Sequence, residues 1–241
     1  MPVNNFTVIE SDYGRFVVNR HSAYQADFLI KTGRPHLERE LQTLLAIVRT
    51  LPAGAITVDA GANIGLIAIP LALALAANGG KVIAFEAQRM MFYALCGGAA
   101  LNDLENLEAF NKALGAKTGR IRVPRVNYGV EQDFGTVTLT GEPAEGEEVD
   151  LVAIDSLGLP RLDFLKIDVE GMEIDVLKGA ATTIRQYHPW CWIEYWKVGE
   201  DRIKSVFYGQ RYKFFRMDEL NMLCAPDERA SSEIKIHAPE I

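Results

Sequence analysis

The segment with the most chemical information spans residues 57–65 and reads Thr-Val-Asp-Ala-Gly-Ala-Asn-Ile-Gly. Its pattern predicts a buried strand that ends in an acidic residue, then a turn and a helix. Because Gly61 has no Cβ, a ligand can approach its backbone, and Gly65 lets the helix pack close to the strand. A cofactor of a parallel sheet binds outside the carboxyl ends of the strands. The expected cofactor contacts here are Asp59, Gly61, Ala62, Asn63 and Gly65, and a plain strand-to-helix turn is the alternative.

The acidic residue before the glycines discriminates between cofactors. A dinucleotide pyrophosphate is an anion that favours a neutral loop at a helix N-terminus. The amino-acid end of S-adenosylmethionine (SAM) instead carries an ammonium group that Asp59 could accept. The turn also fails to match the Gly-x-Gly-x-x-Gly pattern of dinucleotide-binding proteins. These features favour SAM over NAD.

Glu86 ends the next predicted strand, residues 82–86. In a doubly wound sheet this position lies beside the first glycine turn, where a carboxylate can accept both ribose hydroxyls of an adenosine. NAD would need the same acid, so Glu86 indicates a nucleoside without saying which one. A solvated carboxylate at a strand end is the alternative.

A second dense run of acids occupies residues 162–173, Leu-Asp-Phe-Leu-Lys-Ile-Asp-Val-Glu-Gly-Met-Glu. It predicts a strand whose end places Asp168 and Glu170 on the same edge as Gly61. A carboxylate there could accept the proton that an alcohol loses on methylation. Glu173 could instead cap the following helix. The candidate proton acceptors are Asp168, Glu170 and, at the end of the next strand, Glu194.

No metal site is predicted. A divalent ion bridging Asp168 and a second acid could polarise an acceptor hydroxyl, but no second acid stands at metal-ligand spacing. The histidines also lack such spacing, and all four are expected to be surface or turn residues: His21, His36, His188 and His237.

These residues need a sheet to hold them on one edge. Strands are predicted at 56–59, 82–86, 107–112, 164–168 and 190–195, and helices at 65–77, 90–101 and 173–185. Such alternation implies parallel strands joined by right-handed crossovers and covered on both faces. With 207–215 and 221–225 as a last antiparallel pair, we predict an α/β fold with a doubly wound, mostly parallel seven-stranded sheet.

The ends of the chain and one internal stretch are organised differently. Residues 1–35 are predicted to be an N-terminal extension with a hairpin of two strands, 6–10 and 15–19, joined by a tight turn. The main domain is expected at 36–241, beginning with a helix at 36–51. Residues 120–150 lack a helical period and predict a β-hairpin or an irregular insertion.

Composition narrows the partners. The 241 residues carry a net charge of −7, which opposes binding to a phosphate backbone, so no nucleic-acid partner is expected. Three cysteines without a paired motif predict neither a disulfide framework nor a zinc site, which fits a cytoplasmic setting. The longest apolar run, 66–77, is too short to cross a bilayer, so no membrane partner is expected. The sequence does not determine the oligomeric state, and a homodimer is one possibility.

The run 58–65, Phe85-Glu86, the segment 111–115 and the stretches 164–171 and 174–180 together resemble the FkbM family of SAM-dependent methyltransferases. The resemblance covers about 36–225 and departs at Ala87, where the family usually has proline. It implies a Rossmann-like class I methyltransferase fold, SAM as cofactor, and O-methylation of a hydroxyl on a sugar or natural-product small molecule. By position it adds four cofactor contacts: Ala87, Lys112, Ala113 and Asp168.

Two other functions remain open at this point. An NAD-dependent dehydrogenase would share the sheet, the glycine turn and the acidic strand end, although Asp59 counts against it. A catalytically silent SAM-binding module would keep the fold without turnover. A pocket blocked by the 120–150 insertion would favour that module.

Overall fold

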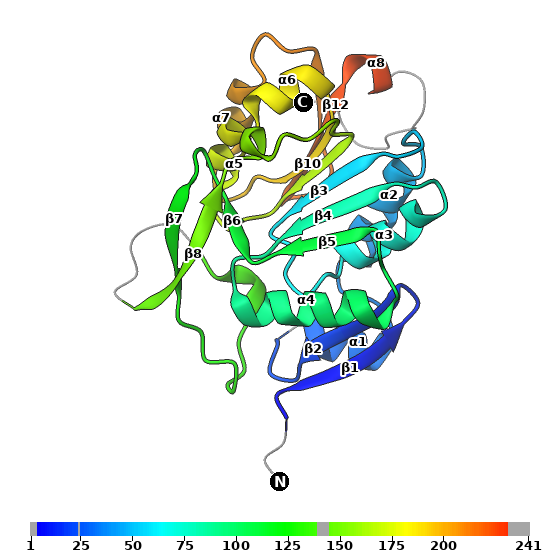
Figure 1. Cartoon of the computed structure of the whole chain (residues 1–241), viewed down its shortest axis with the longest axis vertical. Helices are drawn as coiled ribbons and strands as arrows, with labels where there is room; N and C mark the ends of the chain where they lie inside the picture. Colours follow the sequence, from blue (N-terminus) through cyan, green and yellow to red (C-terminus); the bar gives the residue numbers. More distant parts are fainter. Residues whose placement is uncertain (1–3, 24, 139–144, 231–241) are drawn as a thin grey trace.

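A seven-stranded sheet forms the centre of the computed structural model, which describes residues 4–23, 25–138 and 145–230 (Figure 1). The strand order is β11-β12-β10-β9-β3-β4-β5, and β12 is antiparallel to both its neighbours while the rest run parallel. The strands are β3 (Ile56–Ala60), β4 (Lys81–Phe85), β5 (Leu107–Phe110), β9 (Phe164–Ile167), β10 (Trp190–Glu194), β11 (Tyr212–Arg216) and β12 (Asn221–Pro226). The predicted doubly wound, mostly parallel α/β fold is confirmed.

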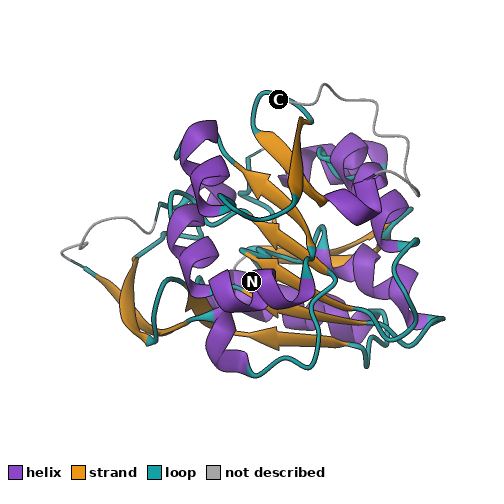
Figure 2. Ribbon diagram, turned by 90° about the horizontal axis from the view of Figure 1, so that it is seen from above, coloured by secondary structure: helices purple, strands orange, loops and turns teal. Residues whose placement is uncertain are grey.

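Helices cover both faces of this sheet (Figure 2). One face carries α2 (Glu38–Val48), α3 (Ala68–Ala76) and α4 (Arg89–Leu101), and the other carries α5 (Glu173–Gly179), α6 (Ala181–Tyr187) and α7 (Glu200–Val206). Because side chains alternate along a strand, each strand supplies both cores. In β4, for example, Val82 and Ala84 pack on the α2 side, whereas Ile83 and Phe85 pack on the α5 side.

The predicted strand at 107–112 is divided between two sheets. β5 ends at Phe110, and Lys112–Leu114 forms β6, which leaves the central sheet and pairs with β8 (Gly146–Val152). β8 also pairs antiparallel with β7 (Gly119–Pro124), which gives a three-stranded sheet of order β6-β8-β7. The 120–150 stretch therefore contains a β-hairpin, as one of its two interpretations predicted, with residues 139–144 outside the described part.

The predicted helix at 173–185 is two helices. α5 ends at Gly179, where an added Cβ would lie 2.0 Å from the Gly115 carbonyl oxygen. The next helix begins with its own cap, because the Asp155 carboxylate accepts hydrogen bonds from the backbone N–H groups of Thr182 and Thr183 at 3.0 and 2.8 Å. Capping from a distant loop is invisible to a helical period, and it explains the break.

The N-terminal hairpin is confirmed as β1 (Phe6–Ser11) and β2 (Gly14–Asn19). It is followed by a helix that the sequence did not predict, α1 (Gln25–Thr32). The hairpin packs on α4 at a glycine pair. A Cβ on Gly97 would lie 2.9 Å from Val17, and one on Gly98 would lie 2.6 Å from Ile69. The glycines therefore let β2 and α3 approach α4 closely.

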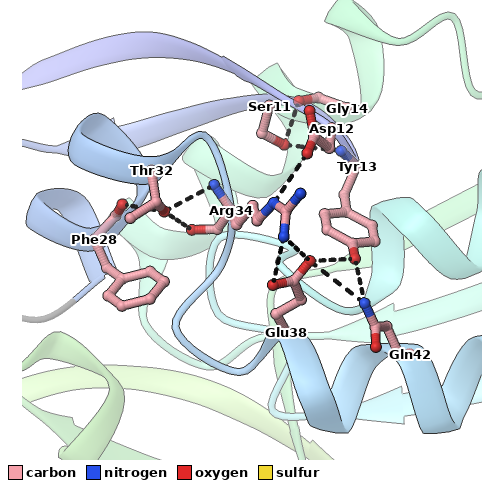
Figure 3. Close-up of polar contacts among 9 residues, drawn as sticks. All are labelled: Ser11, Asp12, Tyr13, Gly14, Phe28, Thr32, Arg34, Glu38 and Gln42. Carbon is pink, nitrogen blue, oxygen red and sulfur yellow. Dashed lines mark hydrogen bonds and ion pairs between the residues drawn. The ribbon is translucent and has the colours of Figure 1, made fainter.

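Polar contacts join the hairpin to the start of α2 (Figure 3). The Arg34 guanidinium donates to Asp12 at 3.1 Å and also pairs with Glu38. The Tyr13 hydroxyl donates to Glu38 at 2.8 Å. These contacts fix the segment that leads into α2, in which His36 and Leu37 line the cavity described below.

The cysteines are free thiols within the described residues. Cys191 and Cys224 lie opposite each other on β10 and β12, and burial raises the pKa of both thiols. Among the described helices, none has the length and apolarity that a membrane span requires.

Candidate cofactor and active site

A cavity of about 250 Å³ opens at the carboxyl ends of β3, β4, β9 and β10. It brings together most of the residues that the sequence predicted for the site. Those that line it are Gly61, Ala62, Asn63, Glu86, Ala87, Lys112, Ala113, Asp168, Glu170 and Glu194. Asp59 and Gly65 do not line it.

The turn after β3 is held by its neighbours. Gly61 has a φ of +79°, and a Cβ there would lie 1.8 Å from the Asp168 carbonyl oxygen. Asn63 is also left-handed, with φ of +49°, and its side chain accepts the Ile64 N–H at 2.8 Å. The N–H groups of Gly61 and Ala62 donate to the Phe85 carbonyl at 3.0 and 2.9 Å. Gly61 is therefore required by the close approach of another backbone as well as by its φ.

Gly65 serves packing between helices. A Cβ at this position would lie 2.7 Å from Leu95 on α4 and 2.9 Å from Ile69 on α3. Its φ of +91° also favours glycine. Gly65 shapes the turn from behind, and a direct contact with the cofactor stays a prediction.

Glu86 clamps the two loops on either side of the cavity. Its Oε2 accepts the Asn63 N–H and its Oε1 accepts the Gln88 N–H, both at 2.7 Å. Burial raises the pKa of this carboxyl to about 7, against the two backbone hydrogen bonds, which lower it. Each carboxylate oxygen has a second lone pair, so Glu86 can still accept hydroxyl groups from the cavity. This arrangement fits the two ribose hydroxyls of an adenosine.

Asp59 faces Lys166, a charged residue within the otherwise apolar strand β9. Asp59 is fully buried, and its Oδ1 lies 3.3 Å from the Lys166 ammonium. The same ammonium lies 3.4 Å from Asp168 Oδ2 and donates to the Gly61 carbonyl at 3.1 Å. Burial raises the pKa of Asp59, whereas Lys166 lowers it. The contact of Asp59 with a cofactor ammonium stays a prediction.

Three carboxylates meet at the edge of the cavity. Asp168, Glu170 and Glu194 place carboxylate oxygens within 4.8 Å of one another. Burial and the neighbouring Asp168 raise the pKa of Glu194 to about 8. Glu170, at a left-handed φ of +58°, forms an ion pair with Lys197. Sequence spacing could not show this grouping because Glu194 comes from another strand.

The three carboxylates could bind a cation, but the ammonium groups of two lysines already neutralise part of their negative charge. Lys166 pairs with Asp168, and Lys197 pairs with Glu170. Glu173 is not part of the cluster. Glu173 lies in the first turn of α5, where helix capping was predicted, but its Oε1 instead accepts the N–H groups of Val169 and Gly171 in the β9–α5 loop.

Several lining residues were not predicted. His36 lies exposed in the turn before α2, as expected, and it also lines the cavity, where partial burial of its ring lowers its pKa. Glu40, in the first turn of α2, does not line the cavity, and burial raises its pKa to about 7. Residues from the insertion also line the cavity: Asp133, Gly135, Thr136 and Val137. From the sequence, the insertion was considered only as a segment that could block the pocket.

Comparisons with known proteins identify the family of this chain. The model of the methyltransferase FkbM domain matches residues 59–221, more than half of the chain. The methyltransferase sdnD of Sordaria araneosa is 27% identical over 164 residues, which cover 55% of this chain and 62% of that protein. The chain therefore spans less than two thirds of that relative.

Two solved structures share the fold. The methyltransferase FkbM of Methylobacillus flagellatus KT superposes with a TM-score of 0.54 at 17% identity, covering 84% of this chain and 55% of that one. Trm5b of Pyrococcus abyssi gives a TM-score of 0.51 at 12% identity, covering 91% and 55%. The chain belongs to the FkbM methyltransferase domain family, and its cofactor is SAM.

Proposed function

We propose that this domain transfers a methyl group from SAM to a hydroxyl oxygen of a small molecule, a sugar or a natural product. One observation carries this proposal. A single cavity contains the carboxylates of Asp168, Glu170 and Glu194 and, beside them, the Gly61 turn and Glu86, which suit the cofactor. Family membership supports methyl transfer and argues against an NAD-dependent dehydrogenase.

The cofactor would be held by Glu86 at its ribose and by the backbone around Gly61, with Lys112 and Ala113 on the neighbouring wall. Bound SAM supplies an electrophilic methyl group on a sulfonium. The protein must then hold the acceptor oxygen in line with that methyl group, and positioning of this kind supplies much of the rate.

The carboxylate edge would take the proton. As the carbon–oxygen bond forms and the carbon–sulfur bond breaks, the acceptor hydroxyl loses its proton. Glu194 suits this task best, because its Oε2 is buried with no hydrogen-bond partner among the described residues. Asp168 and Glu170 are each paired with a lysine and would orient the hydroxyl. Only the ionised form of Glu194 can accept this proton, and with a pKa of about 8 that form becomes more abundant as pH rises toward 8.

The charge of the cavity supports an uncharged acceptor. Its lining carries five carboxyl groups, from Glu86, Asp133, Asp168, Glu170 and Glu194, and two ammonium groups, from Lys112 and Lys166. Glu86 and Glu194 have pKa values of about 7 and about 8, so the negative charge near neutral pH comes mainly from Asp133, Asp168 and Glu170. These three still outnumber the two lysines, which disfavours phosphorylated molecules, including RNA. Leu220, 45% exposed, adds apolar surface to the lining.

A silent module is the competing function. A pocket blocked by the insertion would have favoured it, yet residues 133–137 border a cavity that stays open in the described structure. The intact acids at Glu86, Asp168 and Glu194 also support turnover.

The test is release of S-adenosylhomocysteine (SAH) from SAM with three acceptor panels: neutral glycosides and hydroxylated natural products, their phosphorylated counterparts, and RNA. We expect turnover with the first panel and an O-methylated product by mass spectrometry and NMR. Turnover confined to phosphorylated acceptors or RNA, or methylation at nitrogen or carbon, contradicts the proposal. Cofactor binding without turnover on any panel favours the silent module.

Variants test whether Glu194 is the proton acceptor. Glu194→Gln should lower kcat while SAH affinity, measured by calorimetry, stays near that of the unmodified protein. Glu108→Gln, which changes an exposed acid on β5, serves as the control. Equal losses of kcat in both variants would remove Glu194 from the reaction.

A further inference from the structure

Lys166 is an ammonium group enclosed within the sheet. Its side chain is 4% exposed, and it lies in register with Asp59 on β3 and Trp192 on β10. Alternation places all three on the α2 face, where Glu40 adds a further negative charge toward Lys166. A buried charge persists only when it is paired and hydrogen-bonded, and Lys166 meets this condition by contacting groups from two strands.

Its contacts join two loops that the proposed reaction needs in fixed relation. One contact is the Gly61 carbonyl, in the turn that holds the cofactor, and another is the Asp168 carboxylate, at the acceptor edge. The same loops touch directly, since the Asp168 carbonyl occupies the space that a Gly61 side chain would need. A change in the position of Lys166 would therefore move both loops.

Lys166 also acts on the charge of the carboxylate edge. Its positive charge lowers the pKa of Glu194, which burial and Asp168 raise. It lowers the pKa of Glu40 in the same way. The charged and titratable groups around this edge are Glu40, Asp59, Asp168, Glu170, Glu173, Glu194, Asp218 and Lys197.

We propose that Lys166 is a positioning residue for methyl transfer, which ties the Gly61 turn to Asp168 and so sets the distance between cofactor and acceptor edge. The inference rests on the proposed function above. It adds to that function the claim that the buried ammonium of Lys166 affects both the cofactor affinity and the protonation of the carboxylates at the acceptor edge. Both properties must therefore change when Lys166 is removed.

The test compares Lys166→Met with the unmodified full chain by SAH calorimetry and by ¹³C NMR titration of the Glu194 carboxyl. We expect SAH affinity to fall by about tenfold or more, because the Gly61 turn loses its hydrogen bond to a charged ammonium group. The pKa of Glu194 should rise above its value of about 8, because a neighbouring positive charge is lost.

Arg161→Met is the matched control. Arg161 pairs with the buried Asp163 at 2.7 Å just before the same strand, at the edge away from the cavity. Its removal also takes a close cation from a buried carboxylate, which keeps Arg229 at 4.0 Å. It should lower stability and leave both readouts unchanged. If Lys166 served only to stabilise the fold through its ion pairs, both variants would be less stable, and both would keep the SAH affinity and the Glu194 pKa of the unmodified protein.

Lys166→Met leaves Asp59 buried without its partner and risks unfolding. The double variant Asp59→Asn with Lys166→Met, compared with Asp59→Asn alone, avoids this. Unchanged SAH affinity and an unchanged Glu194 titration across that comparison would overturn the inference. Failure of the unmodified protein to bind SAH would instead overturn the cofactor assignment, while the Glu194 titration would still test Lys166.

Discussion

Replacing Gly61 by alanine should disrupt both the fold and the cofactor site. The φ of +79° at this residue is left-handed, and the added Cβ would lie 1.8 Å from the Asp168 carbonyl oxygen. That atom belongs to the backbone of the neighbouring loop, so no side-chain rotation can relieve the contact. The loops after β3 and β9 must instead move apart by about 1 Å or more to reach ordinary contact.

The magnitude has two parts. A left-handed alanine costs roughly 1–2 kcal/mol. Opening the turn also weakens the hydrogen bonds from Gly61 and Ala62 to the Phe85 carbonyl, each contributing about 1 kcal/mol. Together they predict a loss of about 3–4 kcal/mol in the free energy of unfolding. The displaced turn should also weaken SAH binding by about tenfold or more, because the two hydrogen bonds that hold the turn are weakened.

Gly54→Ala is the matched control. Gly54 has a φ of +70°, yet a Cβ there would meet nothing within 4 Å. It should therefore show the conformational cost alone and bind SAH normally. Urea unfolding followed by tryptophan fluorescence gives the stabilities, and calorimetry gives the affinities. Equal stability losses in the two variants, with SAH affinity intact in Gly61→Ala, would refute the close-approach argument.

Three further predictions concern the site and its support. Glu86→Ala should weaken SAH binding by about 1–3 kcal/mol in calorimetry, because it removes the acceptor for the backbone N–H groups of Asn63 and Gln88 and the expected ribose contact; unchanged affinity would contradict that assignment. The folded-state pKa of Glu194, about 8, exceeds its ordinary value of 4.5, so its contribution to stability is fully present below pH 4.5 and is lost as pH rises to about 8. Glu194→Gln should flatten that part of the pH profile in denaturant unfolding, and an identical profile would count against the raised pKa. Asp155→Ala should destabilise the domain by about 1 kcal/mol or more in urea unfolding, because α6 loses its cap; no loss would show that the cap is dispensable.

Short-range patterns were enough to predict much of this protein. Apolar strands followed by acids and glycines are local features, and they indicated β3, β4 and β9 together with the edge where their residues meet. Glu86 and Asp168 could be assigned to one cavity because parallel strands present their carboxyl ends on the same side of a sheet. The structure places both in the cavity lining.

Other features depended on residues far apart in the sequence. The break after α5 comes from Asp155 and Gly115, and the departure of β6 comes from pairing with β8. No distant contact explains why α1 was not predicted. This helix is short, and it lies in a segment that was interpreted as a hairpin extension.

The chemistry of the site divides in the same way. The sequence by itself determined which acids and glycines stand at the strand ends, because burial and turn geometry restrict those positions locally. The tertiary structure alone decided which charges face one another. Asp59 meets Lys166 only when β3 and β9 become neighbours, and Glu194 joins Asp168 only when β10 is added beside them. Coulomb interactions depend on distance in space, and the fold sets that distance.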